Sequence, residues 1–286
     1  MIRADRIPPT VLVLGGVASV QFGAAFAKTL FDEVGPGGAV FLRVAFAAVF
    51  LCALWRPALR GRSAADWRLI LAYGFVLVAM NLSYYESLDR IPLGIAVTFE
   101  FVGPLGVAVA GSRHALDLLW VALAAAGILL LSNFGTADLD TLGVALALLA
   151  GCFWAAYILL AARVGRTIPG VHGLALAMAA GTFMLAPVGV GQGGADLLSL
   201  SLLGVGAAVA VLSSVIPYTL ELEALRRMPS NVFGVLMSLE PAAAALIGLV
   251  ALNQGLSAVE VAGMSLVIMA SAGVLGASTA RVPTEA

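Results

Sequence analysis

The chain has 286 residues, of which 62% are hydrophobic and 11% are charged, and its mean hydropathy is +1.06. Soluble globular domains carry about 25% charged residues, so this composition excludes an ordinary soluble protein and predicts a membrane protein. The formal net charge of -1 conceals an uneven distribution of charge along the chain.

Ten apolar stretches follow one another along the chain. Each is near the ~20 residues that an α-helix needs to cross ~30 Å of hydrocarbon. The stretches cover residues 9–30, 37–56, 67–87, 93–111, 116–133, 141–162, 171–190, 198–220, 230–252 and 257–278. The connections between them are too short for a separate soluble domain. The sequence therefore predicts an all-α polytopic membrane protein with ten transmembrane helices.

Basic residues are concentrated in alternate connections. Cytoplasmic loops of membrane proteins carry an excess of Lys and Arg, so these connections and both termini are expected in the cytosol. Arg90 lies in an outer connection, and Lys28 and Arg43 lie inside apolar stretches. The other twelve of the 15 basic residues follow the rule: Arg3, Arg6, Arg56, Arg60, Arg62, Arg68, Arg113, Arg163, Arg166, Arg226, Arg227 and Arg281.

The first apolar stretch also has features of a secretory signal. Arg3 and Arg6 precede it, and it contains Ala25-Phe26-Ala27, a small-x-small pattern like a cleavage site. The stretch is longer than a usual signal core, and its removal would leave nine spans. We expect it to be retained.

A short motif occurs twice. The second copy begins 137 residues after the first: Glu86, Leu88, Arg90, Pro92 and Pro104 recur as Glu223, Leu225, Arg227, Pro229 and Pro241. The first copy is predicted in a loop on the outer side of the membrane, and the second in a loop on the cytosolic side. Because five is an odd number of spans, residues 9–133 and 141–278 would form two inverted five-helix repeats, a recurring construction of secondary transporters. Coincidence between two short loops of similar composition is the alternative.

Four ionisable residues lie within the apolar stretches, where a charge is costly and marks a functional candidate. Arg43 and Glu100 have similar predicted depths, so a purely architectural ion pair is one interpretation. Lys28 can instead extend to the outer interface. Glu240 lies nearest the midplane without an evident partner and precedes Pro241, which disturbs the helix. A proton-coupled carrier needs such a carboxyl group, and a structural carboxyl bonded to a neighbouring helix is the alternative.

Polar aromatic residues recur at helical spacing in mid-span positions. Side chains three or four residues apart share one helix face, and inward-facing polar aromatics suit a pocket for a small solute. Interhelical packing is the alternative for each. The candidates are Asn81, Tyr84 and Tyr85 on the third span, Trp154 and Tyr157 on the sixth, Tyr218 on the eighth and Gln21 on the first.

Matches to enzyme motifs occur in the sequence, but their surroundings exclude the corresponding sites. Gly189, Gly191 and Gly194 match a dinucleotide-binding spelling, but they end an apolar helix and follow no strand. His114 and His172 lack metal-ligand spacing, and no nucleophile elbow occurs. We therefore expect no enzyme, no metal and no cofactor.

Several motifs resemble a known transporter family. They are Ile91-Pro-Leu-Gly-Ile-Ala-Val, Glu100-Phe, Gly103-Pro-Leu, Val107-Ala, Ile216-Pro-Tyr-Thr-Leu-Glu and Met237-Ser-Leu-Glu-Pro-Ala, together with Gln21, Ala27-Lys28 and Leu42-Arg43. The pattern is similar to that of the bacterial inner-membrane threonine and homoserine exporters, in the EamA-type branch of the drug/metabolite transporter superfamily. The similarity covers essentially the whole chain.

This resemblance implies two inverted five-helix repeats, alternating access and export of small metabolites driven by proton antiport. Much of the superfamily carries an aromatic residue where Gln21 stands, whereas the threonine and homoserine exporters resemble this chain in having glutamine. The agreement favours an amino-acid substrate. The tail from Arg281 to Ala286 is shorter and less basic than in those exporters.

We therefore expect an inner-membrane exporter of threonine, homoserine or a similar small neutral amino acid, with protons and the lipid bilayer as further partners and no nucleic acid. Lys28 or Arg43 would bind the substrate carboxylate, and Glu100 or Glu240 its ammonium group. Glu240 and Glu100 are the candidates for proton coupling. The alternatives are an exporter of a drug-like, aromatic or sugar-derived solute, an uncoupled channel or scaffold, and a membrane-embedded enzyme. The oligomeric state stays open.

Overall fold

The computed structural model describes residues 7–110, 119–120, 122–127, 130, 139–168, 171–225, 227 and 236–279. Over these residues the chain forms helices and turns and contains no strand. Most of the predicted fifth span and the start of the ninth, including Pro229, lie outside the described residues.

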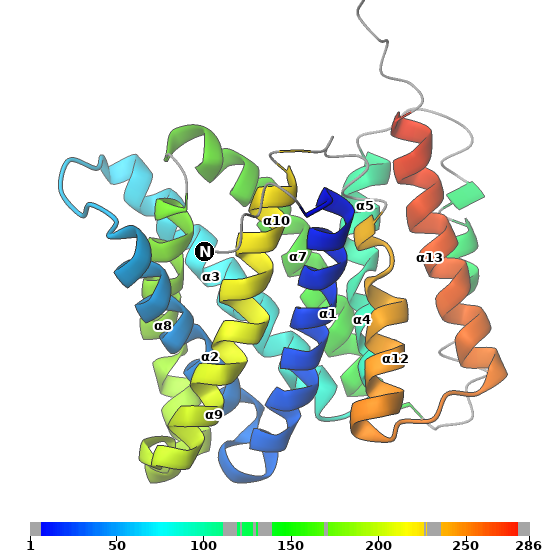
Figure 1. Cartoon of the computed structure of the whole chain (residues 1–286), viewed down its shortest axis with the longest axis horizontal. Coiled ribbons are helices and arrows are strands. Elements are labelled where there is room, and N and C mark those ends of the chain that lie inside the picture. Colours follow the sequence, from blue (N-terminus) through cyan, green and yellow to red (C-terminus); the bar gives the residue numbers. More distant parts are fainter. Residues whose placement is uncertain are drawn as a thin grey trace, which may run out of the picture.

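The described helices form one bundle (Figure 1). They are α1 (Pro9–Ala27), α2 (Phe31–Trp55), α3 (Ala64–Leu88), α4 (Leu93–Glu100), α5 (Val102–Ala110), α7 (Thr141–Thr167), α8 (His172–Gly193), α9 (Leu200–Ala210), α10 (Ile216–Leu225), α12 (Glu240–Leu252) and α13 (Ala258–Thr279). A 3-10 turn, Lys28–Leu30, connects α1 to α2, and another, Gly194–Leu198, follows α8. A π-helical turn, Val211–Val215, connects α9 to α10. Helix α1 begins and α13 ends at the same end of the bundle.

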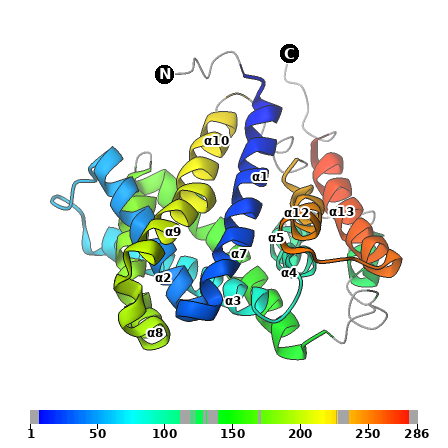
Figure 2. The ribbon, with the colours of Figure 1, turned by 60° about the horizontal axis from the view of Figure 1, so that its bottom comes forward.

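Five described helical segments are long and apolar enough to cross a membrane. They are Pro9–Trp55, Ala64–Leu88, Thr141–Thr167, His172–Leu198 and Leu200–Glu221, and the shorter apolar helices are Leu93–Val107, Glu240–Leu252 and Ala258–Ala270. The first segment has 47 residues, more than twice the ~20 that one crossing needs. Its two helices run in different directions from a turn at the lower end of the bundle (Figures 1 and 2).

The predicted break between the first two spans, at residues 31–36, coincides with a kink in the structure. Residues 31–36 belong to α2, apart from the non-helical backbone of Gly35, with φ 67° and ψ 167°. A positive φ carries little cost for glycine, and Pro36 cannot donate a backbone hydrogen bond. The chain therefore changes direction at the 3-10 turn Lys28–Leu30 and again at Gly35, which lies in the predicted connection.

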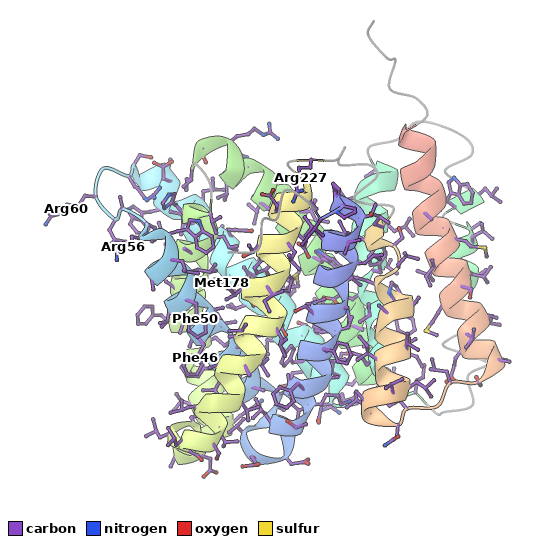
Figure 3. The ribbon with its side chains drawn as sticks, in the orientation of Figure 1. Phe46, Phe50, Arg56, Arg60, Met178 and Arg227 are labelled. Carbon is purple, nitrogen blue, oxygen red and sulfur yellow. The ribbon has the colours of Figure 1, made fainter. Side chains whose placement is uncertain are left out.

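The outer surface of the bundle carries large apolar side chains. Phe183 is 81% exposed and Leu200 is 86% exposed, and Val250 on α12 is 70% exposed. Such side chains on several helices indicate contact with lipid. Arg56, Arg60 and Arg227 lie toward the end of the bundle where α1 begins (Figure 3).

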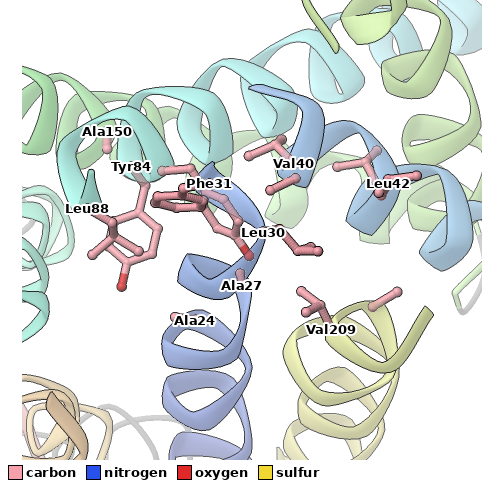
Figure 4. Packing of buried hydrophobic residues seen from close by; sticks show 14 of the residues in the cluster. Ala24, Ala27, Leu30, Phe31, Val40, Leu42, Tyr84, Leu88, Ala150 and Val209 are labelled. Atoms are coloured by element: carbon pink, nitrogen blue, oxygen red, sulfur yellow. The ribbon is translucent and has the colours of Figure 1, made fainter. Parts of the chain in front are cut away.

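The largest buried cluster lies where α1 turns into α2 and packs against α3. Leu30, Phe31 and Leu88 meet there with Tyr84 (Figure 4). The rings of Phe31 and Tyr85 lie 5.8 Å apart, and those of Tyr84 and Tyr85 lie 6.0 Å apart. This cluster fixes the end of α3 that carries the predicted polar aromatics.

Small residues let two further helices approach closely. A Cβ atom at Gly151 would lie 2.6 Å from the carbonyl oxygen of Glu100. A Cβ atom at Gly103 would in turn collide with the carbonyl oxygen of Gly151. The chain at Glu100 is thereby held against the middle of α7.

Candidate functional site

A cavity of about 510 Å³ lies inside the bundle. Helices α1, α2, α3, α4, α5, α7, α10 and α12 contribute to its wall, together with Ser213 of the π-helical turn. Of the eleven predicted site residues, nine line this cavity: Gln21, Arg43, Asn81, Tyr84, Glu100, Trp154, Tyr157, Tyr218 and Glu240. Residues from both halves of the chain are brought together here.

The structure places the other two predicted residues outside the cavity wall. Lys28 Nζ donates a hydrogen bond to the carbonyl oxygen of Leu88, so its side chain joins the α1–α2 turn to the end of α3. Tyr85 is fully buried and lies behind Arg43, with the guanidinium 5.5 Å from the centre of its ring. Tyr85 thus contacts a cavity residue, whereas Lys28 connects the α1–α2 turn to α3.

Arg43 is held by three protein groups. Its Nη1 donates to Tyr85 Oη at 3.2 Å, its Nη2 to the Ser213 carbonyl oxygen at 3.0 Å and its Nε to Ser214 Oγ at 3.4 Å. The predicted ion pair with Glu100 is not formed, although the two side chains interact electrostatically. A guanidinium has five N–H donors, so two remain after these three bonds.

The local sequence around Pro217 explains why a backbone carbonyl is available to Arg43. Proline has no N–H, so Pro217 cannot bond to the carbonyl oxygen of Ser213, four residues earlier. The preceding turn, Val211–Val215, is π-helical, a rare geometry that often occurs at functional sites. Arg43 takes up the acceptor that the helix leaves free, and Ser19 Oγ likewise donates to the neighbouring Leu212 carbonyl at 2.7 Å.

Three carboxylates line the cavity: Glu100, Glu221 and Glu240. Within the described part of the chain, none of the three forms a hydrogen bond or ion pair through its side chain, and one oxygen of Glu240 is fully buried without a partner. Arg43 is the only basic residue among the described residues of the wall. The cavity therefore carries more acidic than basic groups.

Glu221 is absent from the predicted site residues. The eighth stretch was predicted to end at residue 220, whereas α10 continues to Leu225. Glu221 lies three residues after Tyr218 and four after Pro217, so all three share the helix face that lines the cavity. That spacing is the signal that would have found it.

Aromatic rings form much of the remaining wall. Trp154 meets Phe101 edge to face, with ring centres 5.5 Å apart, and Tyr157 stacks on Tyr73 at 5.3 Å. Because Phe101 follows the last residue of α4 and Trp154 lies on α7, this contact holds the end of α4 against α7. The described residues contain no cluster of three or more His, Cys, Asp or Glu residues that could hold a metal ion.

The end of the bundle near Lys28 carries several polar contacts between elements. Gln192 of α8 accepts from the Gly37 backbone N–H at 2.7 Å and donates to Glu86 of α3 at 2.9 Å. Gln254 accepts from the Leu93 backbone N–H at 3.0 Å. Arg90, in the first copy of the repeated motif, lies 3.5 Å from Asp140.

Hydrogen bonds and charge both act on Asp140, which begins α7. Its carboxylate accepts from the Gly143 backbone N–H at 2.8 Å, and that bond, followed by the nearby Arg90, lowers the pKa of Asp140 below its ordinary value. The aspartate therefore stays ionised and caps the helix.

Comparison with known proteins identifies the family of this chain. The EamA-like transporter family matches residues 141–276. Threonine/homoserine exporter RhtA of Salmonella typhimurium (strain LT2) is 41% identical over 268 residues, which cover 93% of this chain and 90% of that protein. The chain belongs to the EamA-like transporter family. RhtA of Escherichia coli (strain K12) shows the same identity and coverage.

A solved crystal structure has the same overall fold as this EamA-like transporter. The TM-score is 0.65 at 17% sequence identity, over 96% of this chain and 99% of the other. At that identity the likeness concerns the fold alone. Family membership makes the protein a membrane transporter and not an enzyme.

Proposed function

We propose that this protein exports small neutral amino acids, with threonine and homoserine as its substrates, by proton antiport. The observation that carries the proposal is the 41% identity, over 93% of the chain, to proteins named threonine/homoserine exporters. The cavity supports it because one wall offers a cation and the others offer carboxylates.

An amino-acid zwitterion needs two opposite partners. Arg43 keeps two N–H donors after its bonds to the protein, and two donors from one planar guanidinium suit a carboxylate. Arg43 is favoured over Lys28 for this role because Arg43 lines the cavity and Lys28 binds the Leu88 carbonyl. Glu100 and Glu240 remain the candidates for the ammonium group, and Glu221 joins them.

The proposed architecture has ten helices in two inverted repeats, residues 9–133 and 141–278. Helix contacts support it, because α3 packs on α7 and α1 packs on α10, which are the pairs that exchange when the halves are swapped. The swap would also exchange α2 with α8 and α4 with α12, and the members of each of these pairs pack on each other. We place both termini in the cytosol and the protein in the bacterial inner membrane.

Proton coupling in this proposal centres on Glu240, with Glu100 as the second candidate. Glu240 is buried, lacks a partner on one oxygen and lies in the cavity wall, so substrate and proton can both reach it. It takes a proton from outside and releases it inside as the cytosolic amino acid binds. Alternating access then exposes the substrate-loaded cavity to the outside.

The test is threonine flux driven by a pH gradient in proteoliposomes. Glu240→Gln should lose the stimulation of threonine flux by the gradient, because the amide cannot exchange the proton. Glu33→Gln, an exposed carboxylate outside the cavity, is the matched control and should behave like the wild type. Coupling of wild-type strength in Glu240→Gln would remove Glu240 from the mechanism.

The aromatic wall favours a second candidate substrate. Trp154, Tyr157 and Phe101 offer more apolar surface than threonine can cover, and a cavity of about 510 Å³ lies in the range of sites for larger metabolites. A counterflow panel of labelled neutral amino acids, aromatic metabolites and drug-like amines separates these substrates. Saturable counterflow of any of them also excludes an uncoupled channel or scaffold.

A further inference from the structure

Three buried oxygen atoms without hydrogen-bond partners lie in the wall of the cavity. They are Gln21 Oε1, Ser213 Oγ and Glu240 Oε2. Their residues are 4%, 2% and 6% exposed, so the surrounding solvent does not satisfy them. A buried polar atom without a partner is energetically unfavourable, and three in one cavity indicate a ligand that supplies the missing donors.

The three oxygens come from three separate elements that meet at the cavity. Gln21 lies on α1, Ser213 on the π-helical turn and Glu240 at the first residue of α12. The absence of a side chain at Gly23 brings α1 close to Ser213, because a Cβ atom there would collide with Ser213 Oγ. The π-helical turn also supplies the carbonyl that holds Arg43, so Ser213 contacts the guanidinium and lines the same cavity as Gln21 and Glu240.

We propose that Gln21 Oε1, Ser213 Oγ and Glu240 Oε2 form the subsite for the ammonium group of the substrate. A primary ammonium has three N–H donors and no acceptor, which matches three unpartnered acceptors. Glu240 supplies the negative charge that a neutral donor would not require. The assignment rests on the proposed amino-acid export and adds Ser213 to the residues that bind the substrate.

With this subsite, the cavity has one region for the carboxylate of the substrate and another for its ammonium group. Ser213 contributes its backbone carbonyl to Arg43 and its side-chain oxygen to the ammonium subsite. One turn of helix therefore orients the group for the carboxylate and contacts the ammonium. In an α-amino acid those two groups are attached to one carbon, so recognition of both requires such closeness.

The experiment measures the affinity of purified protein for three probes by calorimetry or competition. The probes are L-threonine, 1-amino-2-propanol, which lacks the carboxylate, and 2,3-dihydroxybutanoate, which carries a hydroxyl in place of the ammonium. Ser213→Ala should weaken both amine-bearing probes roughly 10- to 100-fold, as expected for a lost hydrogen bond to a charged group. The affinity for 2,3-dihydroxybutanoate should be weak and unchanged.

Two further variants guard against a folding effect. Gln21→Met removes a second of the three oxygens at similar volume and should reproduce the pattern of Ser213→Ala. Ser87→Ala is the matched control, because Ser87 Oγ is also buried without a partner but lies outside the cavity wall. Its affinity for all three probes should equal that of the wild type.

The outcomes separate this inference from the proposed function. Equal weakening of all three probes by Ser213→Ala, no weakening at all, or no binding of 1-amino-2-propanol to the wild type would overturn the ammonium subsite. Binding of 1-amino-2-propanol that depends on Ser213, in a protein without threonine counterflow, would support the subsite and overturn threonine export.

Discussion

Arg43 and Glu240 are both ionisable, both buried and both in the wall of one cavity, yet their surroundings differ. Arg43 has three hydrogen-bond partners from α3 and the π-helical turn. Glu240 keeps one buried oxygen without any partner. The protein therefore fixes the cation in one position and leaves the anion for something that enters the cavity. A fixed cation suits a substrate group, and a free carboxylate suits a proton or an ammonium that comes and goes.

The largest loss of threonine affinity is expected when the fixed cation is removed. Arg43→Leu deprives Tyr85 and Ser213 of their donor and leaves the carboxylates without a basic neighbour among the described wall residues. Loss of charge-assisted bonds worth about 1.5–3 kcal/mol each predicts a fall in threonine affinity of at least about 100-fold. Calorimetry on purified protein measures it.

Arg43→Lys and Arg60→Leu make that test specific. Lysine keeps the charge but lacks the planar fork, so we expect an intermediate loss of about tenfold. Arg60 is exposed in the connection between α2 and α3, and its removal should leave affinity unchanged. Equal affinity in Arg43→Leu and the wild type, with both folded by thermal melting, would disprove a role for Arg43 in carboxylate binding.

A smaller change tests how the cation is fixed. Tyr85→Phe removes the hydroxyl that accepts from Arg43 Nη1 at 3.2 Å but keeps the ring that packs on Phe31. One lost bond of about 1 kcal/mol predicts roughly fivefold weaker threonine binding. The affinity for 1-amino-2-propanol, which has no carboxylate, should not change. A parallel loss for both compounds would mean that Tyr85 acts on the whole cavity and not through Arg43.

The cavity residues found from the sequence share one physical property. A charge or polar aromatic within an apolar stretch is costly unless it faces a partner or a cavity, and that cost identified Arg43, Glu100 and Glu240 before any contact was known. This signal depends on the composition of a single stretch, which a sequence displays directly.

The features that sequence reasoning missed depend on the path of the chain. Glu221 falls one residue beyond the predicted end of its span, and only the continuation of α10 to Leu225 turns it into the cavity. Ser213 is small and neutral, so its importance arises from the π-helical turn. Lys28 has the charge of a site residue, but the 3-10 turn that begins there joins it to Leu88.

The weakest effect is expected at Asp66, an acid outside the cavity that accepts two hydrogen bonds through Oδ2, in contrast to the unpartnered oxygen of Glu240. Asp66 accepts from the Ser63 backbone N–H and hydroxyl, each at 2.9 Å, in a capping box at the start of α3. These hydrogen bonds lower the pKa of Asp66. Because the folded-state pKa is lowered, the stabilisation is present above the ordinary value of about 3.9 and is lost as the pH falls through the lowered value.

Asp66→Ala should therefore lower the melting temperature slightly at pH 7, and the difference from the wild type should shrink below about pH 4. Threonine counterflow should stay within about twofold of the wild type, as for other surface substitutions. Thermal melting across pH 3–7 and counterflow at pH 7 measure the two effects. A large loss of counterflow would mean that a satisfied carboxylate outside the cavity also controls transport, and the distinction between fixed and free charges would then fail.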